Sequence, residues 1–140
     1  MTDIPHVSDD LFARGEDASG PNFSGAVWLA QLLNPDQVDA TDLSAYNVTF
    51  APGCRNSWHS HSQGQILLVT RGVGYHQIRG QAIQVIHPGD VVVCPPNTEH
   101  WHGATPDCEM THIGISPHAA TNQTTWLEPV SDAEYGAVNR

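Results

Sequence analysis

Short apolar runs alternate with turn-forming residues along this chain of 140 residues. The runs are rich in Val, Ile and Leu, the residues between them are mostly Gly, Pro and Asn, and no long stretch has the periodicity of an amphipathic helix. The apolar runs lie at 24–33, 45–53, 65–72, 74–80, 81–90, 90–97, 99–104 and 108–116. A spacing of roughly ten residues, with turns between the runs, is typical of an all-β sandwich or barrel. The pattern therefore predicts an all-β protein.

The two ends of the chain depart from this strand pattern. Residues 1–22 are polar and contain Pro and Gly at intervals, so we expect an arm with at most one helical turn. Ser131 and Glu134 have the spacing of a capping box, which predicts a short C-terminal helix. No linker-like composition interrupts the chain. We therefore expect one domain over residues 1–140, with a core barrel at about residues 24–118.

Charge and composition limit the partners of the protein. A formal net charge of −10 with only five Lys and Arg residues argues against binding to nucleic acid or to an anionic membrane surface. If the substrate is an anion, Arg55, Arg71 and Arg79 are the expected counter-charges. The chain has no signal-like start and no apolar run near the roughly 20 residues that cross a bilayer. Its three cysteines lack disulfide-framework spacing, so we expect a cytoplasmic protein with reduced thiols.

Two His-x-His pairs carry the candidate chemistry. His59 and His61 form one pair, and His100 and His102 form the other. Residues two apart on a strand point to the same face, so each pair aims two imidazoles in one direction. A single pair is readily explained as two partly exposed histidines on a strand. Two pairs in one small β protein favour metal binding, because a site needs several imidazoles that converge from a rigid scaffold.

The residues around both pairs resemble the two sequence motifs of the cupin superfamily. The first is Gly53-x5-His59-x-His61-x3-Gln65-x6-Gly72, with glutamine where many members have glutamate. The second runs from Gly89-Asp90 to Pro95-Pro96-Asn97-Thr98-Glu99-His100, with Asn97 where glycine is common. The resemblance covers roughly residues 45–116 and implies a single-domain, jelly-roll-type β-barrel. It also implies a metal site, whose four ligands would be His59, His61, Gln65 and His100.

A narrower resemblance concerns the reaction. Trp-His-Ser-His, His-Pro-Gly-Asp-Val-Val, His-Trp-His-Gly-Ala and Met-Thr-His together are similar to the small cupin-type hydroxynitrile lyases. The resemblance implies a manganese ion, or sometimes iron, in a site of three histidines and one glutamine. It also implies reversible cleavage of a cyanohydrin into an aldehyde and cyanide. His102 and His112 would then line the cavity near the metal as candidate catalytic residues, with His102 as the acid/base.

The ligand set itself favours Lewis-acid chemistry on a small oxygenated molecule. Three neutral imidazoles and a neutral amide leave a divalent ion with its full charge, whereas a glutamate at position 65 would reduce it. Mn²⁺ is the first expectation, and Fe²⁺, Ni²⁺, Zn²⁺ or Co²⁺ suit the same ligands. Two alternatives keep the site: an Fe-dependent dioxygenase or sugar-acid isomerase, and a non-catalytic protein that binds metal or a small molecule.

Several other residues have less specific expectations. Trp58 and Trp101 precede predicted ligands, so they should face outward and pack between the barrel and the terminal segments. The remaining histidines are expected at the surface, and a set of apolar residues is expected to fill the barrel or wall the cavity. The surface histidines are His6, His76, His87 and His118, and the apolar set is Phe50, Leu67, Val69, Val91 and Val93. The apolar run at 24–33 is long for an exposed edge strand, which predicts a homodimer or homotetramer.

Overall fold

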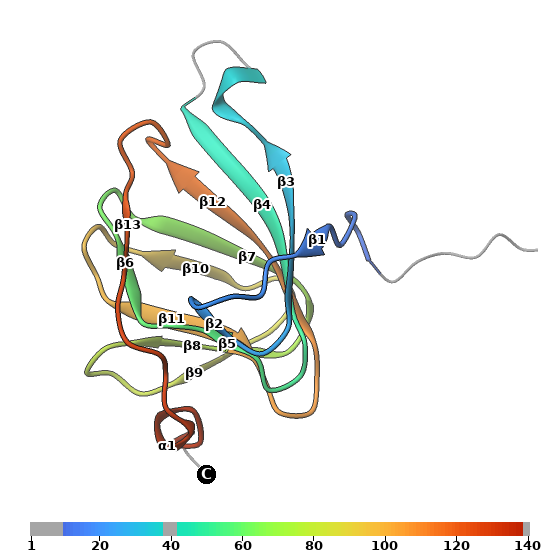
Figure 1. Cartoon of the computed structure of the whole chain (residues 1–140), viewed down its shortest axis with the longest axis vertical. Coiled ribbons are helices and arrows are strands. Elements are labelled where there is room, and N and C mark those ends of the chain that lie inside the picture. Colours follow the sequence, from blue (N-terminus) through green and yellow to red (C-terminus); the bar gives the residue numbers. More distant parts are fainter. Residues whose placement is uncertain (1–9, 38–41, 139–140) are drawn as a thin grey trace, which may run out of the picture.

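Two β-sheets face each other in the structure, a computed structural model that describes residues 10–37 and 42–138 (Figure 1). All strand pairings in these residues are antiparallel. The first sheet has the order β1 (Glu16–Asp17), β3 (Val27–Leu33), β4 (Leu43–Phe50), β12 (Met110–Pro117), β7 (Gln65–Gly72) and β10 (Val91–Cys94). The second has the order β13 (Thr124–Trp126), β6 (His59–His61), β11 (His100–Ala104), β5 (Arg55–Asn56) and β2 (Phe23–Ser24). In addition, β8 (Gly74–Ile78) pairs with β11, and β9 (Gln84–Ile86) pairs with β8.

The prediction of an all-β barrel-type fold with a short C-terminal helix is confirmed. The helix α1 spans Asp132–Tyr135, and the predicted capping box is present between Ser131 and Glu134. A single 3-10 turn, η1, lies at Pro35–Gln37. No helix among the described residues is long and apolar enough to cross a membrane.

An apolar core fills part of the space between the two sheets. Its buried members include Val27, Val48, Phe50, Leu67, Val69, Val92 and Met110. On β4, β7 and β12 the pairing register places inward side chains opposite one another, because Val48 pairs with His112 and Leu67 pairs with Gly114. On these strands, the inward face that lines the apolar core therefore also carries residues of the polar site.

One strand has the opposite phase from that expected. Val91 and Val93 are each 62% exposed, so the prediction that they fill the barrel is wrong, whereas Val92 and Cys94 are buried. All four residues of β10 are apolar, and alternation of polarity therefore cannot reveal which face points inward. The register decides it: Val92 lies opposite Leu67, which is fully buried, and shares its face.

Two residues of the motifs, Asn97 and Gly72, have positive φ angles. Asn97 has a φ of 58°, so it adopts the left-handed conformation that the usual glycine would take. Gly72 has a φ of 75°, and a Cβ atom there would lie 1.8 Å from the carbonyl oxygen of Glu109. Position 72 therefore requires glycine for both its backbone conformation and the space around it.

The C-terminal segment is held on the outside of the second sheet. Trp58 and Trp101 pack with Val130, as predicted for outward-facing residues beside the ligands. Arg55 donates a 2.7 Å hydrogen bond to the Val130 carbonyl oxygen, and the Arg79 guanidinium lies 4.1 Å from the centre of the Trp58 ring. Next to these contacts β13 pairs with β6, and this pairing brings Trp126 to the site.

Candidate metal centre and cavity

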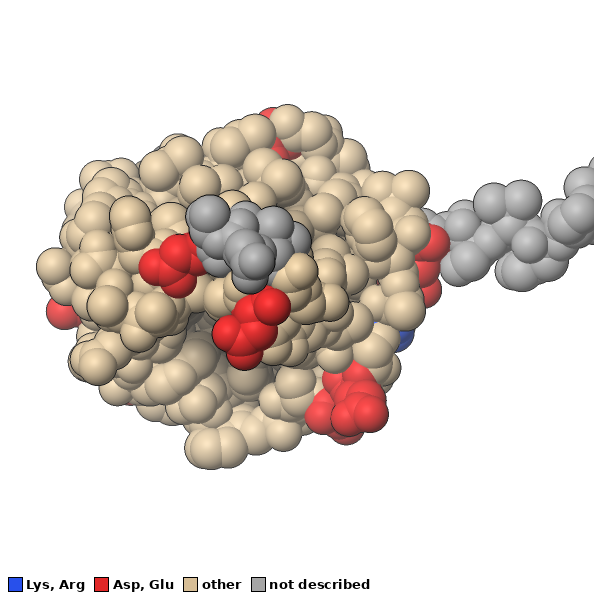
Figure 2. Space-filling model, turned by 90° about the horizontal axis from the view of Figure 1, so that it is seen from above, with Lys and Arg blue, Asp and Glu red and all other residues tan. Residues whose placement is uncertain are grey.

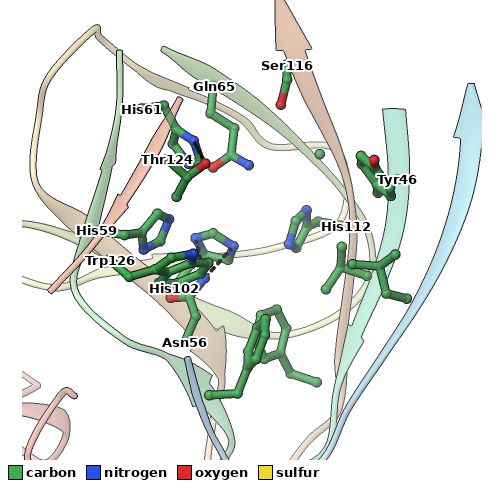
Figure 3. A pocket seen from close by; sticks show the side chains of 15 residues that line it. Tyr46, Asn56, His59, His61, Gln65, His102, His112, Ser116, Thr124 and Trp126 are labelled. Atoms are coloured by element: carbon green, nitrogen blue, oxygen red, sulfur yellow. Dashed lines mark hydrogen bonds between the residues drawn. The ribbon is translucent and has the colours of Figure 1, made fainter. Parts of the chain in front are cut away.

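Strands of both sheets bring the predicted ligands together: β6 and β11 of one sheet and β7 of the other. His59 and His61 point inward from β6, and His100 on β11 lies directly opposite His59 in the strand register. The ring nitrogens that these three residues can offer all lie within 4.8 Å of one another. Gln65, at the start of β7, extends its amide into the same space, beside His61 (Figure 3). The structure therefore brings His59, His61 and His100 together, with Gln65 beside them.

Each of the three imidazoles has its Nδ1 atom engaged by a different neighbour. His59 Nδ1 lies 2.7 Å from the Ser57 carbonyl oxygen, and His61 Nδ1 lies 3.0 Å from the Thr124 hydroxyl oxygen. His100 Nδ1 lies 3.3 Å from the Cys94 sulfur. In proteins, a metal-bound histidine is usually fixed in this way, with one ring nitrogen held by a neighbour and the other left for the ion.

Polar atoms without partners test whether a metal ion fits here. His61 Nε2, Gln65 Oε1 and His100 Nε2 are buried, and none has a hydrogen-bond partner among the described residues. An unsatisfied buried polar atom costs about 1–3 kcal/mol, so folded proteins rarely leave several together. Three nitrogen donors and one amide oxygen suit a divalent transition metal. The donor set therefore fits such an ion, which this cluster could hold.

Burial keeps the histidines of the cluster uncharged. Desolvation lowers the pKa of His59 to about 3, and it lowers the pKa values of His61 and His100 as well. A neutral imidazole has the lone pair that metal ligation needs, whereas a protonated one does not. At neutral pH the cluster is therefore already in the protonation state that a metal requires.

His102 lies beside this cluster, and the Asn56 side chain contacts both its backbone and its ring. The Asn56 Oδ1 atom accepts a 2.9 Å hydrogen bond from the His102 backbone N–H, which fixes the orientation of the amide. The Nδ2 atom then faces the imidazole, 3.1 Å from Nε2 and 3.4 Å from Nδ1. Because an amide nitrogen only donates, it favours a ring nitrogen with a lone pair. Full burial also holds the pKa of His102 well below its usual value, so this side chain is neutral.

His112 faces His102 across the cavity from β12. Its ring stacks on Phe50 with a centroid distance of 6.0 Å and meets the His102 ring edge-on at 4.8 Å. Both ring nitrogens are buried without a hydrogen-bond partner among the described residues. Desolvation lowers the pKa of His112 to about 4. A neutral imidazole therefore presents one donor and one acceptor that the folded chain does not use.

The cavity that these residues line has a volume of about 290 Å³ (Figure 3). Its polar wall includes His59, His61, Gln65, His102 and His112. Its apolar and aromatic lining residues are Phe23, Leu29, Val48, Phe50 and Trp126. None of the 15 lining residues is Asp, Glu, Lys or Arg. The cavity thus suits an uncharged molecule with both an apolar body and a polar end.

The arginines expected to meet an anionic substrate lie elsewhere, and none of them lines this cavity. Arg55 pairs with Asp132 at 3.0 Å, Arg71 pairs with Glu109 at 2.9 Å, and Arg79 pairs with Glu99 and Glu128. The face seen in Figure 2 is hollowed and carries several acidic side chains around the hollow, with almost no basic surface. These features argue against an anionic substrate.

The predictions for the remaining histidines need one correction. His87 and His118 are exposed, as expected, and His6 lies outside the described residues. His76 was expected at the surface but is 1% exposed, with its Nε2 atom 3.4 Å from the Cys94 sulfur. It lies mid-strand on β8 and pairs with His102 on β11, so it points into the barrel. His76 stands outside both motifs, so nothing in the sequence marked it as buried.

Sequence reasoning also missed two residues of the cavity. Asn56 reaches His102 because β5 and β6 both pair with β11. Trp126 covers His59, with ring centroids 4.7 Å apart, from a strand 67 positions further along the chain. Neither residue lies in a recognisable motif, and their roles depend on pairings between distant segments. Only the in-phase spacing of Thr124 and Trp126 hinted that both face one side of a strand.

Comparison with known proteins agrees with this architecture. Residues 46–114 match the family model of the cupin domain. The chain is 41% identical over 125 residues to a protein named (R)-mandelonitrile lyase from Granulicella tundricola, which covers 86% of this chain and 94% of that protein. A cupin-like protein from Thermotoga maritima has a solved structure with 45% identity and a TM-score of 0.87, covering 93% of this chain and 98% of that one.

A more distant relative extends the likeness of fold alone. The structure of a DMSP lyase from Ruegeria pomeroyi is 19% identical and has a TM-score of 0.64, covering 86% of this chain and 61% of that one. The sequence motifs, the two facing sheets, the cupin-domain match and the close relatives all agree. This chain belongs to the cupin superfamily.

Proposed function

We propose that this protein is a metal-dependent lyase of the hydroxynitrile type, which cleaves an aryl cyanohydrin into an aldehyde and hydrogen cyanide. The observation that carries the proposal is a cluster of neutral histidines, with unsatisfied buried polar atoms, beside a cavity without charged side chains. The relative named (R)-mandelonitrile lyase supports the same reaction.

The proposed metal ligands are His59, His61, Gln65 and His100. A bound divalent ion, for which Mn²⁺ is our first expectation, supplies a Lewis acid for the substrate oxygen. The chain contributes ligands that are all uncharged, so none of the ion's charge is neutralised by the protein. The partners of Nδ1 on His59, His61 and His100 hold the rings in place and leave Nε2 available.

The aromatic wall gives the proposal its substrate class. Phe23 and Phe50 have ring centroids 6.3 Å apart, and Phe23 and Trp126 are 5.9 Å apart. An aryl group that packs among these rings gains hydrophobic burial and favourable ring contacts. Its hydroxyl and nitrile groups then face the polar wall. A neutral cyanohydrin fits this division, whereas a sugar acid would bring a carboxylate that no arginine meets here.

His102 and His112 supply the proton transfers. The rings of His59 and His100 lie 5.7 and 5.6 Å from that of His102, so His102 is beside the cluster where the hydroxyl oxygen would lie. In the proposed step, the substrate hydroxyl replaces the Asn56 amide N–H at the lone pair of His102, and His102 takes the hydroxyl proton while the bond between the carbinol carbon and the nitrile carbon breaks. The carbonyl forms, and the electron pair of the broken bond leaves on cyanide. The proton that His102 has taken passes through His112, whose ring lies 4.8 Å away, to the leaving cyanide, which gives neutral hydrogen cyanide and returns both imidazoles to the neutral form.

A direct test measures both products and oxygen. The protein is loaded with Mn²⁺, Fe²⁺ or Ni²⁺ and mixed with mandelonitrile, and benzaldehyde, cyanide and oxygen uptake are followed together. We expect equal amounts of benzaldehyde and cyanide without oxygen consumption. His59→Ala should lose metal and activity, and His102→Ala should keep the metal and lose activity. His87→Ala, at an exposed position, is the matched control.

Three results would refute the proposal. Unchanged rates of mandelonitrile cleavage in both His59→Ala and His102→Ala would contradict the roles proposed for these two residues. Product formation that requires oxygen would indicate an oxygenase instead. Tight metal binding with no turnover of mandelonitrile or of other aryl cyanohydrins would favour a non-catalytic binding protein.

A further inference from the structure

A second group of buried polar side chains lies behind His100, on the side away from the cavity. Neither His76 nor Cys94 lines the cavity, and each is only 1% exposed. Together with His100 they form a group whose possible ligand atoms all lie within 4.8 Å of one another, which is close enough to hold a metal ion. The proposed lyase reaction uses neither His76 nor Cys94, so their burial needs a separate explanation.

Hydrogen-bond distances link these side chains in one line. His100 Nδ1 lies 3.3 Å from the Cys94 sulfur, which in turn lies 3.4 Å from His76 Nε2. His76 Nδ1 lies 3.4 Å from Oε1 of Gln84, the residue directly opposite His76 on β9. The line therefore begins at an exposed strand, crosses the wall of the barrel through two buried side chains and ends at a proposed metal ligand.

With the Gln84 side-chain oxygen facing His76, the donors and acceptors along the line permit one direction of hydrogen bonding. The Gln84 oxygen can only accept, so His76 Nδ1 carries a proton and His76 Nε2 carries a lone pair. That lone pair accepts the Cys94 thiol proton, and the Cys94 sulfur accepts the proton on His100 Nδ1. His100 Nε2 is then left with its lone pair, and this atom is buried with no hydrogen-bond partner among the described residues.

We propose that Cys94 and His76 form a positioning relay that holds His100 with its Nε2 lone pair facing His59 and His61. The relay makes His100 a ligand for the cavity-side cluster and not for the deeper group that contains the thiol. It explains why a free cysteine lies fully buried beside a histidine that must keep one tautomer. The proposal rests on the metal centre assigned above, but the tautomer itself exists without metal.

The reversed orientation of the Gln84 side-chain amide would contradict the relay. If the Gln84 amide nitrogen lay where its oxygen lies, every hydrogen bond along the line would reverse. His100 would then carry its proton on Nε2, where it would block the metal. A third possibility is that the deeper group is itself a soft-metal site, with the Cys94 thiolate as a ligand.

The first experiment reads the tautomers directly in the metal-free wild-type protein. Long-range proton–nitrogen NMR correlations on protein with ¹⁵N-labelled histidine distinguish an Nδ1-protonated ring from an Nε2-protonated one. We expect both His100 and His76 to be protonated on Nδ1. An Nε2 proton on His100 would overturn the relay. Because this measurement involves no metal, it decides the relay even if the wild-type protein binds no metal and the proposed function fails.

The second experiment measures Zn²⁺ and Mn²⁺ affinity by competition with a chelator. Cys94→Ala removes the acceptor for His100, and we expect roughly 10–100-fold weaker binding, as for other residues that orient a metal ligand. Cys94→Ser keeps a donor and an acceptor and should recover most of that loss. Cys108→Ala, at a half-buried cysteine outside the site, is the matched control. Urea unfolding of each metal-free variant separates loss of fold from loss of affinity.

Unchanged metal affinity in a folded Cys94→Ala protein would overturn the relay, and so would equal losses in the alanine and serine variants. Loading the wild-type protein with Co²⁺ gives an independent outcome. A sulfur-to-cobalt charge-transfer band would show that the thiolate is a ligand and would establish the deeper site instead. A Co²⁺ spectrum without that band, together with the serine rescue, would support the relay.

Discussion

Acid should unfold the metal-free protein at a pH where most proteins of this size are stable. The four most deeply buried histidines of the site share the cause: burial lowers the pKa of His59 to about 3 and that of His112 to about 4, and it holds those of His100 and His102 low as well. In the unfolded chain the same side chains titrate near 6.5. Below that pH the unfolded state therefore binds protons that the folded state excludes.

The magnitude follows from proton linkage. The folded-state pKa values are depressed, so the stability from these groups is fully present above about pH 6.5 and is lost as pH falls toward about 4. At pH 5 each neutral buried histidine costs about 2 kcal/mol relative to its protonated unfolded form. The four together cost about 8 kcal/mol, against the roughly 5–15 kcal/mol that stabilises an ordinary domain. Most of the stability should be gone near pH 5.

The assay is urea unfolding, followed by tryptophan fluorescence, at a series of pH values between about 8 and 4.5. The transition midpoint should be constant above about pH 7 and then fall steeply, with a nearly constant m-value. His112→Phe removes one of the four groups and should reduce the loss at pH 5 to about 6 kcal/mol. His87→Gln, at an exposed position, should leave the profile unchanged. A midpoint that is constant from pH 7 to 5 would contradict the assignment of these histidines as buried and neutral.

Four further outcomes are expected. Mn²⁺ at a free concentration of 100 times its dissociation constant should raise the free energy of unfolding by about 2.7 kcal/mol. It should also move the acid transition to lower pH, which the same urea series measures. Gln65→Glu should bind Mn²⁺ more tightly in calorimetry yet turn mandelonitrile over more slowly, because the carboxylate offsets part of the ion's charge. Trp126→Ala should raise KM for mandelonitrile about tenfold, with a smaller effect on an aliphatic cyanohydrin, in steady-state kinetics. Sedimentation should show a dimer or tetramer and not a 15.2 kDa species, because β1 pairs only with Trp28 and Leu29 of β3 and leaves most of that edge uncovered among the described residues.

Local patterns in the sequence predicted the features that depend on a few neighbouring residues. Alternation placed His59 and His61 on one face, because residues two apart on any strand share a face. The capping box at Ser131 predicted the helix for a similar reason, since its hydrogen bonds join residues three apart. The two motifs carried the convergence of His100 with the first pair, through the resemblance to cupins and not through spacing alone.

Features that depend on strand register could not be predicted in this way. The four apolar residues of β10 look the same in both phases, and only the pairing of Val92 with Leu67 determines which side is inside. His76 was misplaced because its burial arises from the pairing of β8 with β11. Trp126 joins the cavity through a pairing between β13 and β6, which lie at opposite ends of a long intervening chain. In each case the missing information is long-range and is carried by the fold.

The acid sensitivity and the proposed chemistry both depend on histidines that are buried in a cavity without negative charge. A carboxylate at position 65 would attract protons to the neighbouring imidazoles and raise their pKa values, because an opposite charge favours the charged form. It would also reduce the effective charge of a bound divalent ion. With Gln65 in that place, His59, His61 and His100 remain neutral and available as ligands, and His102 remains neutral and able to accept a proton. The same lone pairs then serve the ion at neutral pH and take up protons on unfolding in acid. A variant that gains acid stability through Gln65→Glu should therefore lose turnover, and the two changes should occur together because they share this cause.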